Sequence, residues 1–86
     1  MITTYKILYW QEIPSQIVAE DDENAVSVPL ADKFMELIEA AAMSRGLAGS
    51  DDYLAQWKWS DSRTRDGTAE EVARALKAEL ESKTDW

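Results

Sequence analysis

The 86-residue chain contains no cysteine and no histidine. Without cysteine it cannot form a disulfide, a thiolate nucleophile, a zinc–thiolate site or an iron–sulfur cluster. Without histidine it lacks the side chain that most often serves as a general base or metal ligand near neutral pH. Catalysis would have to use carboxylates, lysine, tyrosine or serine, so the two absences favour a binding protein over an enzyme.

Glycine and proline are also scarce, with three glycines and two prolines in the whole chain. This scarcity argues against a disordered linker, and the hydrophobic fraction of 45% and charged fraction of 30% are typical of globular domains. A chain of this length has room for one hydrophobic core. We therefore expect a single folded domain over residues 1–86.

Basic residues are outnumbered, nine against seventeen acidic ones, which gives a formal net charge of −8. This charge opposes binding to nucleic-acid phosphates and to anionic membrane surfaces. No apolar run approaches the roughly 20 residues of a membrane span, and residues 1–6 do not resemble a signal peptide. Together with the missing disulfides, these features predict a cytoplasmic protein that binds neither nucleic acid nor membranes.

Three short strands are predicted in the first third of the chain. Residues 5–10 are rich in aromatic and β-branched side chains, and Pro14 then favours a turn. Segments 15–20 and 25–28 follow as further strands, separated by the acidic turn 21–24. The pattern predicts a three-stranded antiparallel meander over about residues 4–30.

Helical periodicity replaces the strand pattern after residue 30. Apolar side chains recur at helical spacing from Phe34 to Ala42, and Gly46 suits a C-terminal cap. Thr68 and Glu71 have the spacing of a capping box. We expect helices at 32–45, 50–59 and 68–83, with a polar loop over 60–67. The predicted fold is α+β, in the order βββααα, with the helices packed on one face of the sheet.

The first strand carries large apolar side chains on both faces. Tyr5, Ile7 and Tyr9 point to one side, and Leu8 and Trp10 point to the other. If the helices cover one face, then either a helix or the C-terminal tail wraps onto the second face, or a partner covers it. Trp10 is therefore a candidate partner contact.

Trp57 and Trp59 lie two residues apart, near the end of the predicted second helix. Side chains at this spacing point about 200° apart on a helix, so both cannot face the core. Trp57 shares a face with Tyr53 and Leu54, which leaves Trp59 partly exposed as an interface anchor. The alternative is that the helix ends at Lys58 and Trp59 folds back over the loop.

Arg63 and Arg65 flank Thr64 just before the predicted third helix. Two guanidinium groups beside a helix N-terminus and Trp59 could hold a carboxylate or a phosphate. The alternative is a solvated loop in which the two arginines pair with Asp61 and Asp66.

Acidic clusters do not form a metal-binding pattern in this sequence. Segment 20–23 lacks the glycine turn and spacing of a calcium loop, and Arg63 and Arg65 would repel a cation held by segment 61–70. The chain has no P-loop, dinucleotide-binding glycine pattern or nucleophile elbow. We predict no catalytic residue, no metal site and no cofactor.

Several segments together resemble a known family. The matching residues are Tyr5–Trp10, Ile13-Pro14, Gln16, Ala40–Met43, Gly46–Asp51, Tyr53-Leu54 and Trp57, and they extend over most of residues 5–59. They resemble the small bacterial virulence factor domain, a module that also occurs within the larger conserved virulence factor C. The resemblance implies a domain identity without a defined activity, and it suggests a link to folate and one-carbon metabolism.

The sequence thus predicts a non-enzymatic protein-interaction or accessory module that docks on a larger partner or pairs with itself. The candidate contacts are Trp10, Trp59, Arg63 and Arg65. The alternative is a subunit that handles a small molecule or cofactor, with a pocket near Trp59 and an arginine at its mouth.

Overall fold

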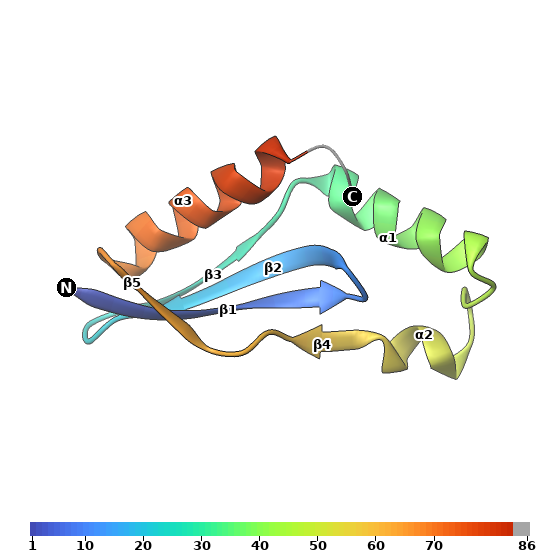
Figure 1. Ribbon diagram of the computed structural model, residues 1–86, viewed down its shortest axis with the longest axis horizontal. Helices are drawn as coiled ribbons and strands as arrows, with labels where there is room; N and C mark the ends of the chain where they lie inside the picture. Colours follow the sequence, from blue (N-terminus) through green and yellow to red (C-terminus); the bar gives the residue numbers. More distant parts are fainter. Residues whose placement is uncertain (84–86) are drawn as a thin grey trace.

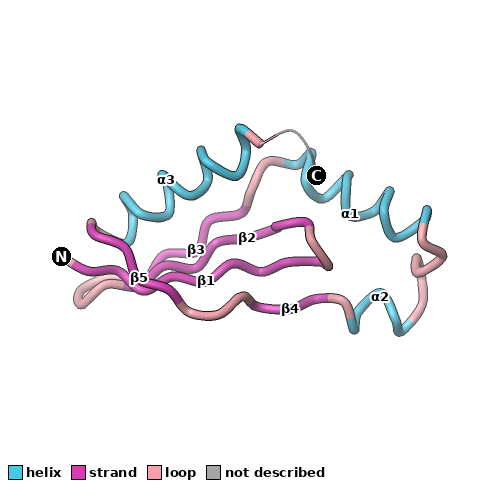
Figure 2. The backbone as a smooth tube through the Cα atoms, in the orientation of Figure 1, coloured by secondary structure: helices cyan, strands magenta, loops and turns pink. Residues whose placement is uncertain are grey.

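The computed structural model describes residues 1–83 as a five-stranded antiparallel sheet with three helices (Figures 1 and 2). Residues 84–86 lie outside the described part. The elements, in chain order, are β1 (Ile2–Trp10), β2 (Ile13–Glu20), β3 (Ala25–Pro29), α1 (Asp32–Ser44), α2 (Asp51–Ala55), β4 (Trp57–Trp59), β5 (Arg63–Asp66) and α3 (Ala69–Ser82).

The strands are ordered β3-β2-β1-β4, and β5 also pairs with β1. β1 is long enough to pair with two short strands, one after the other, along one edge. Its last residues, Leu8–Trp10, pair with β4, and its first residues, from Ile2 to Tyr5, pair with β5. The other edge of β1 pairs with β2 along almost its whole length, with Ile7 opposite Ile17.

The predicted α+β class is confirmed, but the order βββααα is wrong. The predicted second helix ends at Ala55, and residues 57–59 form β4 instead of its last turn. The predicted polar loop 60–67 contains β5. Both corrections have one cause: β1 would otherwise present an edge of unpaired backbone groups, and these two segments supply its hydrogen-bond partners.

The hydrophobic core lies between the sheet and the helices. α3 packs on β1, β2 and β3, and α1 packs on β2 (Figure 1). The larger core side chains are Ile7, Trp10, Ile13 and Ile17 from the sheet, Phe34 and Ile38 from α1, and Val72 and Leu76 from α3. The α1 and α3 members recur at helical spacing, as the periodicity predicts.

The ends of the two long helices follow local sequence signals. The Thr68 side chain accepts a hydrogen bond from the Glu71 backbone N–H, and the Glu71 carboxylate accepts one from the Thr68 backbone N–H. After α1, Gly46 has a φ of 72°, a left-handed conformation that glycine adopts without steric cost. The predicted capping box of α3 and the predicted C-terminal glycine cap of α1 are therefore confirmed.

Candidate functional site

Trp10 has no exposed surface. Its indole Nε1–H donates a hydrogen bond to the Tyr53 carbonyl oxygen, and the two rings lie 5.6 Å apart between centroids. The Arg45 guanidinium lies over the Trp10 ring, 5.9 Å from its centre. α2 and Arg45 thus enclose this residue, and we leave Trp10 out of the proposed contact surface.

Trp59 is 47% exposed, which confirms the predicted partial exposure. The reason given by helical spacing is wrong, because Trp57 and Trp59 lie in a strand and therefore point to the same face. Trp59 lies opposite Leu8 of β1, and the Lys6 ammonium lies 5.2 Å from the centre of its ring. Lys6 and Leu8 thus flank the exposed indole on this side of the sheet.

Trp59 and the two arginines do not form one site. Arg63 lies opposite Tyr5 and Arg65 lies opposite Thr3, whereas Trp59 lies opposite Leu8. Partners across an antiparallel pair share a face, and odd and even positions of β1 face opposite ways. The arginines therefore point to the face opposite Trp59, and the predicted combination of a tryptophan and two arginines in one pocket is wrong.

The two arginines differ in their partners. Arg65 forms a bidentate ion pair with Glu79 of α3, with its shorter distance at 2.7 Å, and this bonding lowers the pKa of the Glu79 carboxyl. Arg63 forms no ion pair with any residue between 1 and 83. The predicted alternative, pairing with Asp61 and Asp66, is therefore not found in this part of the chain.

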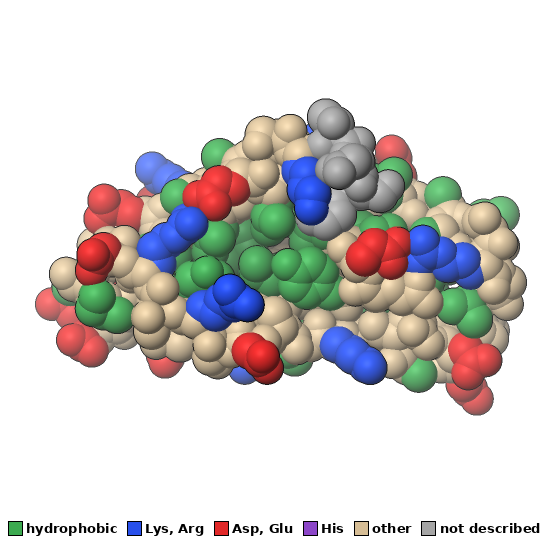
Figure 3. All heavy atoms as spheres, viewed as in Figure 1, with side chains coloured by type: hydrophobic (Ala, Val, Ile, Leu, Met, Phe, Trp, Pro, Cys, Tyr) green, Lys and Arg blue, Asp and Glu red, His purple; other side chains and the backbone are tan. Residues whose placement is uncertain are grey.

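Arg63 lies at a hollow on the helix-covered side of the sheet, which we call the sheet groove. It has a volume of about 580 Å³ and is lined by Tyr5, Ile7, Tyr9, Ser60, Asp61 and Arg63. Figure 3 shows apolar side chains gathered in a hollow between α3 and the edge formed by β4 and β5, with basic side chains beside it. The groove combines an apolar floor with polar groups at its sides.

The pKa of Tyr9 depends on its burial in the sheet groove and on the charge of Arg63. Burial raises the pKa of its hydroxyl above the ordinary value of 10.0, while the positive charge of Arg63 acts in the opposite direction. The hydroxyl therefore keeps its proton at neutral pH and can donate a hydrogen bond. Arg63 and Tyr5 both act electrostatically on Tyr9, and all three side chains line the sheet groove.

Ser60 lies between β4 and β5 and attaches this part of the chain to β1. Its backbone N–H donates to the Ile7 carbonyl at 2.8 Å, and its hydroxyl oxygen accepts from the Ile7 N–H at 2.9 Å. A side chain thus supplies the acceptor that a strand backbone would otherwise provide. This contact holds the wall of the sheet groove against its Ile7 floor.

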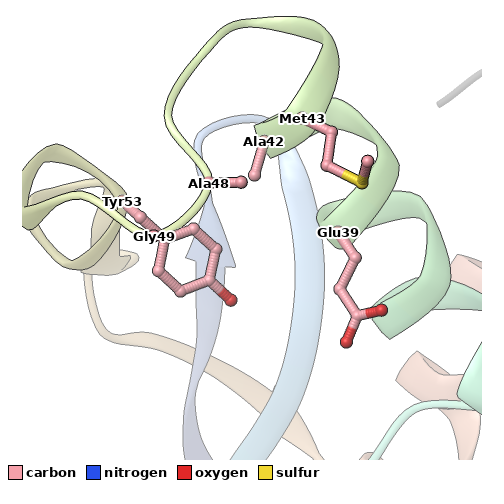
Figure 4. A pocket seen from close by; sticks show the side chains of 6 residues that line it. All are labelled: Glu39, Ala42, Met43, Ala48, Gly49 and Tyr53. Atoms are coloured by element: carbon pink, nitrogen blue, oxygen red, sulfur yellow. The ribbon is translucent and has the colours of Figure 1, made fainter.

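A second hollow, which we call the helix groove, lies between α1, the 46–50 loop and α2. It has a volume of about 290 Å³ and a largely apolar lining of Glu39, Ala42, Met43, Ala48, Gly49 and Tyr53. Figure 4 shows Ala42 and Ala48 meeting at one end, with Tyr53 and Glu39 on opposite sides. Tyr53 is held between Trp10 and Trp57, whose ring meets it edge-on at 6.2 Å.

Apolar side chains are exposed on both helices that form the helix groove. Met43 of α1 is 72% exposed and Leu54 of α2 is 66% exposed. Neither was a sequence-based candidate. Leu54 was predicted to share the apolar face of Tyr53 and Trp57, and its exposure shows that this was wrong. A methionine at the end of an apolar helix usually packs in a core. The only available signal was that Met43 lies off the stripe from Phe34 to Ala42.

The described residues contain neither a metal-binding cluster nor a membrane-spanning helix. Between residues 1 and 83, acidic side chains do not gather in a group of three or more that could hold a metal ion. The helices in that same range are too short and too polar to cross a bilayer.

The chain was compared with known proteins. Searches of curated proteins and of solved structures gave no match. A family model described as Virulence factor matches residues 8–85, including the segment after Ser60 for which the sequence alone suggested no resemblance. Because this match spans most of the chain, the protein belongs to the Virulence factor family.

Proposed function

We propose that the chain is a non-enzymatic accessory module that docks on a larger protein through the helix groove. The observation that carries the proposal is the exposure of Met43 and Leu54, at 72% and 66%, on the two helices that form an apolar hollow. Large apolar side chains beside a hollow are typical of protein contact sites.

The helix groove is suited to receive a side chain from a partner. Its Tyr53 side is rigid, because the ring is packed between Trp10 and Trp57. Its α1 side is adaptable, because Met43 is unbranched and exposed. A volume of about 290 Å³ fits one or two large apolar side chains.

The charges around the helix groove favour a different protein, and not a second copy of this chain, as the partner. Glu39 lines the helix groove, and Asp51 and Asp52 are exposed in the first turn of α2. Two copies meeting here would bring these carboxylates together, on chains that each carry a formal charge of −8. We therefore expect a partner segment with one or two apolar anchors flanked by lysine or arginine.

Trp59 remains a candidate for a second contact. It is half-exposed on the side of the sheet opposite the sheet groove, and its indole is flanked by Lys6 and Leu8. Arg65 is already paired with Glu79, so a partner that bound Arg65 would first have to break that ion pair.

The proposal is tested by capturing partners from a host lysate with the tagged full chain and measuring each purified candidate by calorimetry. The double variant Met43→Ser, Leu54→Ser removes the anchors, and Ile2→Ser is the matched control, being 56% exposed at the start of β1. We expect the double variant to weaken binding at least about tenfold and Ile2→Ser to leave it unchanged.

Rising salt should also weaken the complex if basic partner residues meet the acidic groove. The proposal is wrong if no captured protein binds directly, or if the double variant and the control bind equally well. A concentration-dependent dimer of the purified chain, abolished by the double variant, would show instead that a second copy occupies the groove.

A further inference from the structure

We infer that the sheet groove is a binding site for a small organic monoanion, with a carboxylate held by Arg63, Tyr5 and Tyr9 and a flat apolar body lying against Ile7. This site is on different elements from the helix groove and does not depend on the docking proposal. Its residues come from β1, β5 and the connection between β4 and β5.

Strand register brings the three polar side chains together. Tyr5, Ile7 and Tyr9 alternate along β1 and therefore share one face. Arg63 is the direct partner of Tyr5 across the β1–β5 pair, so its side chain projects from the same face. Two phenols and one guanidinium thus border the groove above Ile7, which is 7% exposed.

Arg63 is the charged group with which the anion would pair. It lines the groove and makes no ion pair with the described residues, whereas Arg65, two positions along the same strand, is occupied by Glu79. A planar guanidinium binds a carboxylate through two parallel hydrogen bonds. The phenol hydroxyl groups can donate hydrogen bonds to the same oxygens or to a ring substituent.

The charge of one other lining residue disfavours a ligand with more than one negative charge. Asp61 also lines the groove, and it opposes a second anionic group near Arg63. The formal charge of −8 on the whole chain acts in the same direction. A carboxylate on an aromatic or otherwise flat body therefore fits better than a diphosphate or triphosphate.

The size of the groove agrees with a ligand of this kind. A volume of about 580 Å³ lies within the range of small-molecule sites, which is roughly 300–1,000 Å³. The Ile7 side chain and the tyrosine rings offer a surface against which a ring can lie. The Ser60 hydroxyl is already bonded to the Ile7 N–H, so it stabilises the wall and is less available to a ligand.

The test uses the full chain labelled with nitrogen-15 and follows backbone amide shifts during titration with benzoate. Benzamide is the neutral isostere, and inorganic phosphate is a probe for binding driven by charge alone. We expect saturable benzoate shifts centred on residues 5–9 and 60–63, with a Kd on the order of millimolar for so small a probe. Benzamide and phosphate should bind at least about tenfold more weakly.

Two variants show whether Arg63 carries the binding. Arg63→Gln should weaken benzoate binding about tenfold, and Tyr9→Phe should weaken it by a smaller factor. Lys6→Gln is the matched control, because it removes the same charge from an exposed residue of β1 whose side chain lies on the opposite face, beside Trp59, and outside the groove lining. All three variants should keep the dispersed spectrum of the folded chain.

The inference is overturned if benzoate gives no saturable shifts, if its shifts map outside the groove, or if benzamide or phosphate binds as tightly. It also fails if Lys6→Gln weakens binding as much as Arg63→Gln. Because Met43 and Leu54 do not line the sheet groove, the double variant Met43→Ser, Leu54→Ser should bind benzoate normally whether or not a protein docks on the helix groove.

Discussion

Trp10 and Tyr53 are joined by a hydrogen bond of 2.9 Å from the indole Nε1 to the backbone carbonyl oxygen, across 43 positions of sequence. The bond ties the end of β1 to α2, a helix of only five residues that has no buried residue of its own. Such a short helix is not stable alone, so its position depends on this attachment. The Tyr53 side of the helix groove is therefore set by a residue of the sheet core.

Replacing Trp10 by phenylalanine removes this hydrogen bond and part of a fully buried ring. We expect the free energy of unfolding to fall by about 2 kcal/mol, from lost packing and the lost bond. Urea denaturation measures the change. Trp59→Phe is the control, and because Trp59 is 47% exposed it should change stability by less than about 0.5 kcal/mol. Equal losses in the two variants would contradict the assignment of Trp10 as a core anchor.

Replacing Ser60 by alanine leaves the Ile7 backbone N–H without its side-chain acceptor. Because this donor is partly buried, we expect a loss of about 1–2 kcal/mol and faster hydrogen exchange at the Ile7 amide. Ser62→Ala is the control, because the Ser62 side chain is exposed and makes no hydrogen bond within residues 1–83. Unchanged exchange at Ile7 in Ser60→Ala would show that the serine does not hold the β4–β5 connection to β1.

Asp21 connects the β2–β3 turn to the start of α3. Its carboxylate accepts hydrogen bonds from the backbone N–H groups of Ala69, Asn24 and Glu23, and these lower its pKa below the ordinary value of 3.8. A folded-state pKa below the unfolded value means that the charged form stabilises the fold above about pH 4. That contribution is lost as the pH falls through the lowered folded-state pKa.

We therefore expect the stability of the chain to decline between about pH 5 and pH 2, and the decline to be shallower in Asp21→Asn. Glu12, Glu79 and Glu81 also have lowered pKa values, so the slope should decrease without vanishing. Urea denaturation at a series of pH values measures the slope. An unchanged slope in Asp21→Asn would mean that the Asp21 charge does not stabilise this junction.

Gly46 has a φ of 72°, and a Cβ added there would meet no atom within 4 Å. Any cost of Gly46→Ala therefore comes from the left-handed backbone and not from a clash, and we expect about 1 kcal/mol. Asparagine tolerates this conformation better, so Gly46→Asn should cost less. Thermal unfolding of the three proteins measures the order, and equal stabilities would show that the α1 end does not require this backbone conformation.

The elements that were predicted well are those with local signals. α1 and α3 show an apolar stripe over three turns and end at a glycine or begin at a capping box, and their bounds agree with the predicted ranges within two residues. The three strands at the start of the chain were also predicted, and the acidic turn 21–24 separates β2 from β3 as expected. The turn expected at Pro14 is wrong, because Pro14 lies in β2 opposite Tyr9 and the chain turns at residues 11–12. Neighbouring residues decide such features, so one sequence is enough to recognise them.

The elements that were missed depend on residues far away in the chain. β4 and β5 have three and four residues, too few to show a period, and they are strands because the edge of β1 needs partners. Helical spacing pointed to an exposed Trp59 for the wrong reason, and both its exposure and its separation from Arg63 follow from the register of β4 and β5 against β1. The helix groove depends in the same way on the attachment of α2 to Trp10.

By itself the sequence determined the α+β class, the acidic surface, the lack of thiol and imidazole chemistry, and the positions of the two long helices. Composition and short-range periodicity are properties of the chain before it folds, so they can be read directly. Only the tertiary structure decided which side chains share a face and which remain uncovered. A shift of register by one residue reverses the face of every side chain in a strand, and the register of β4 and β5 is set by pairing with distant residues of β1, as between Leu8 and Trp59.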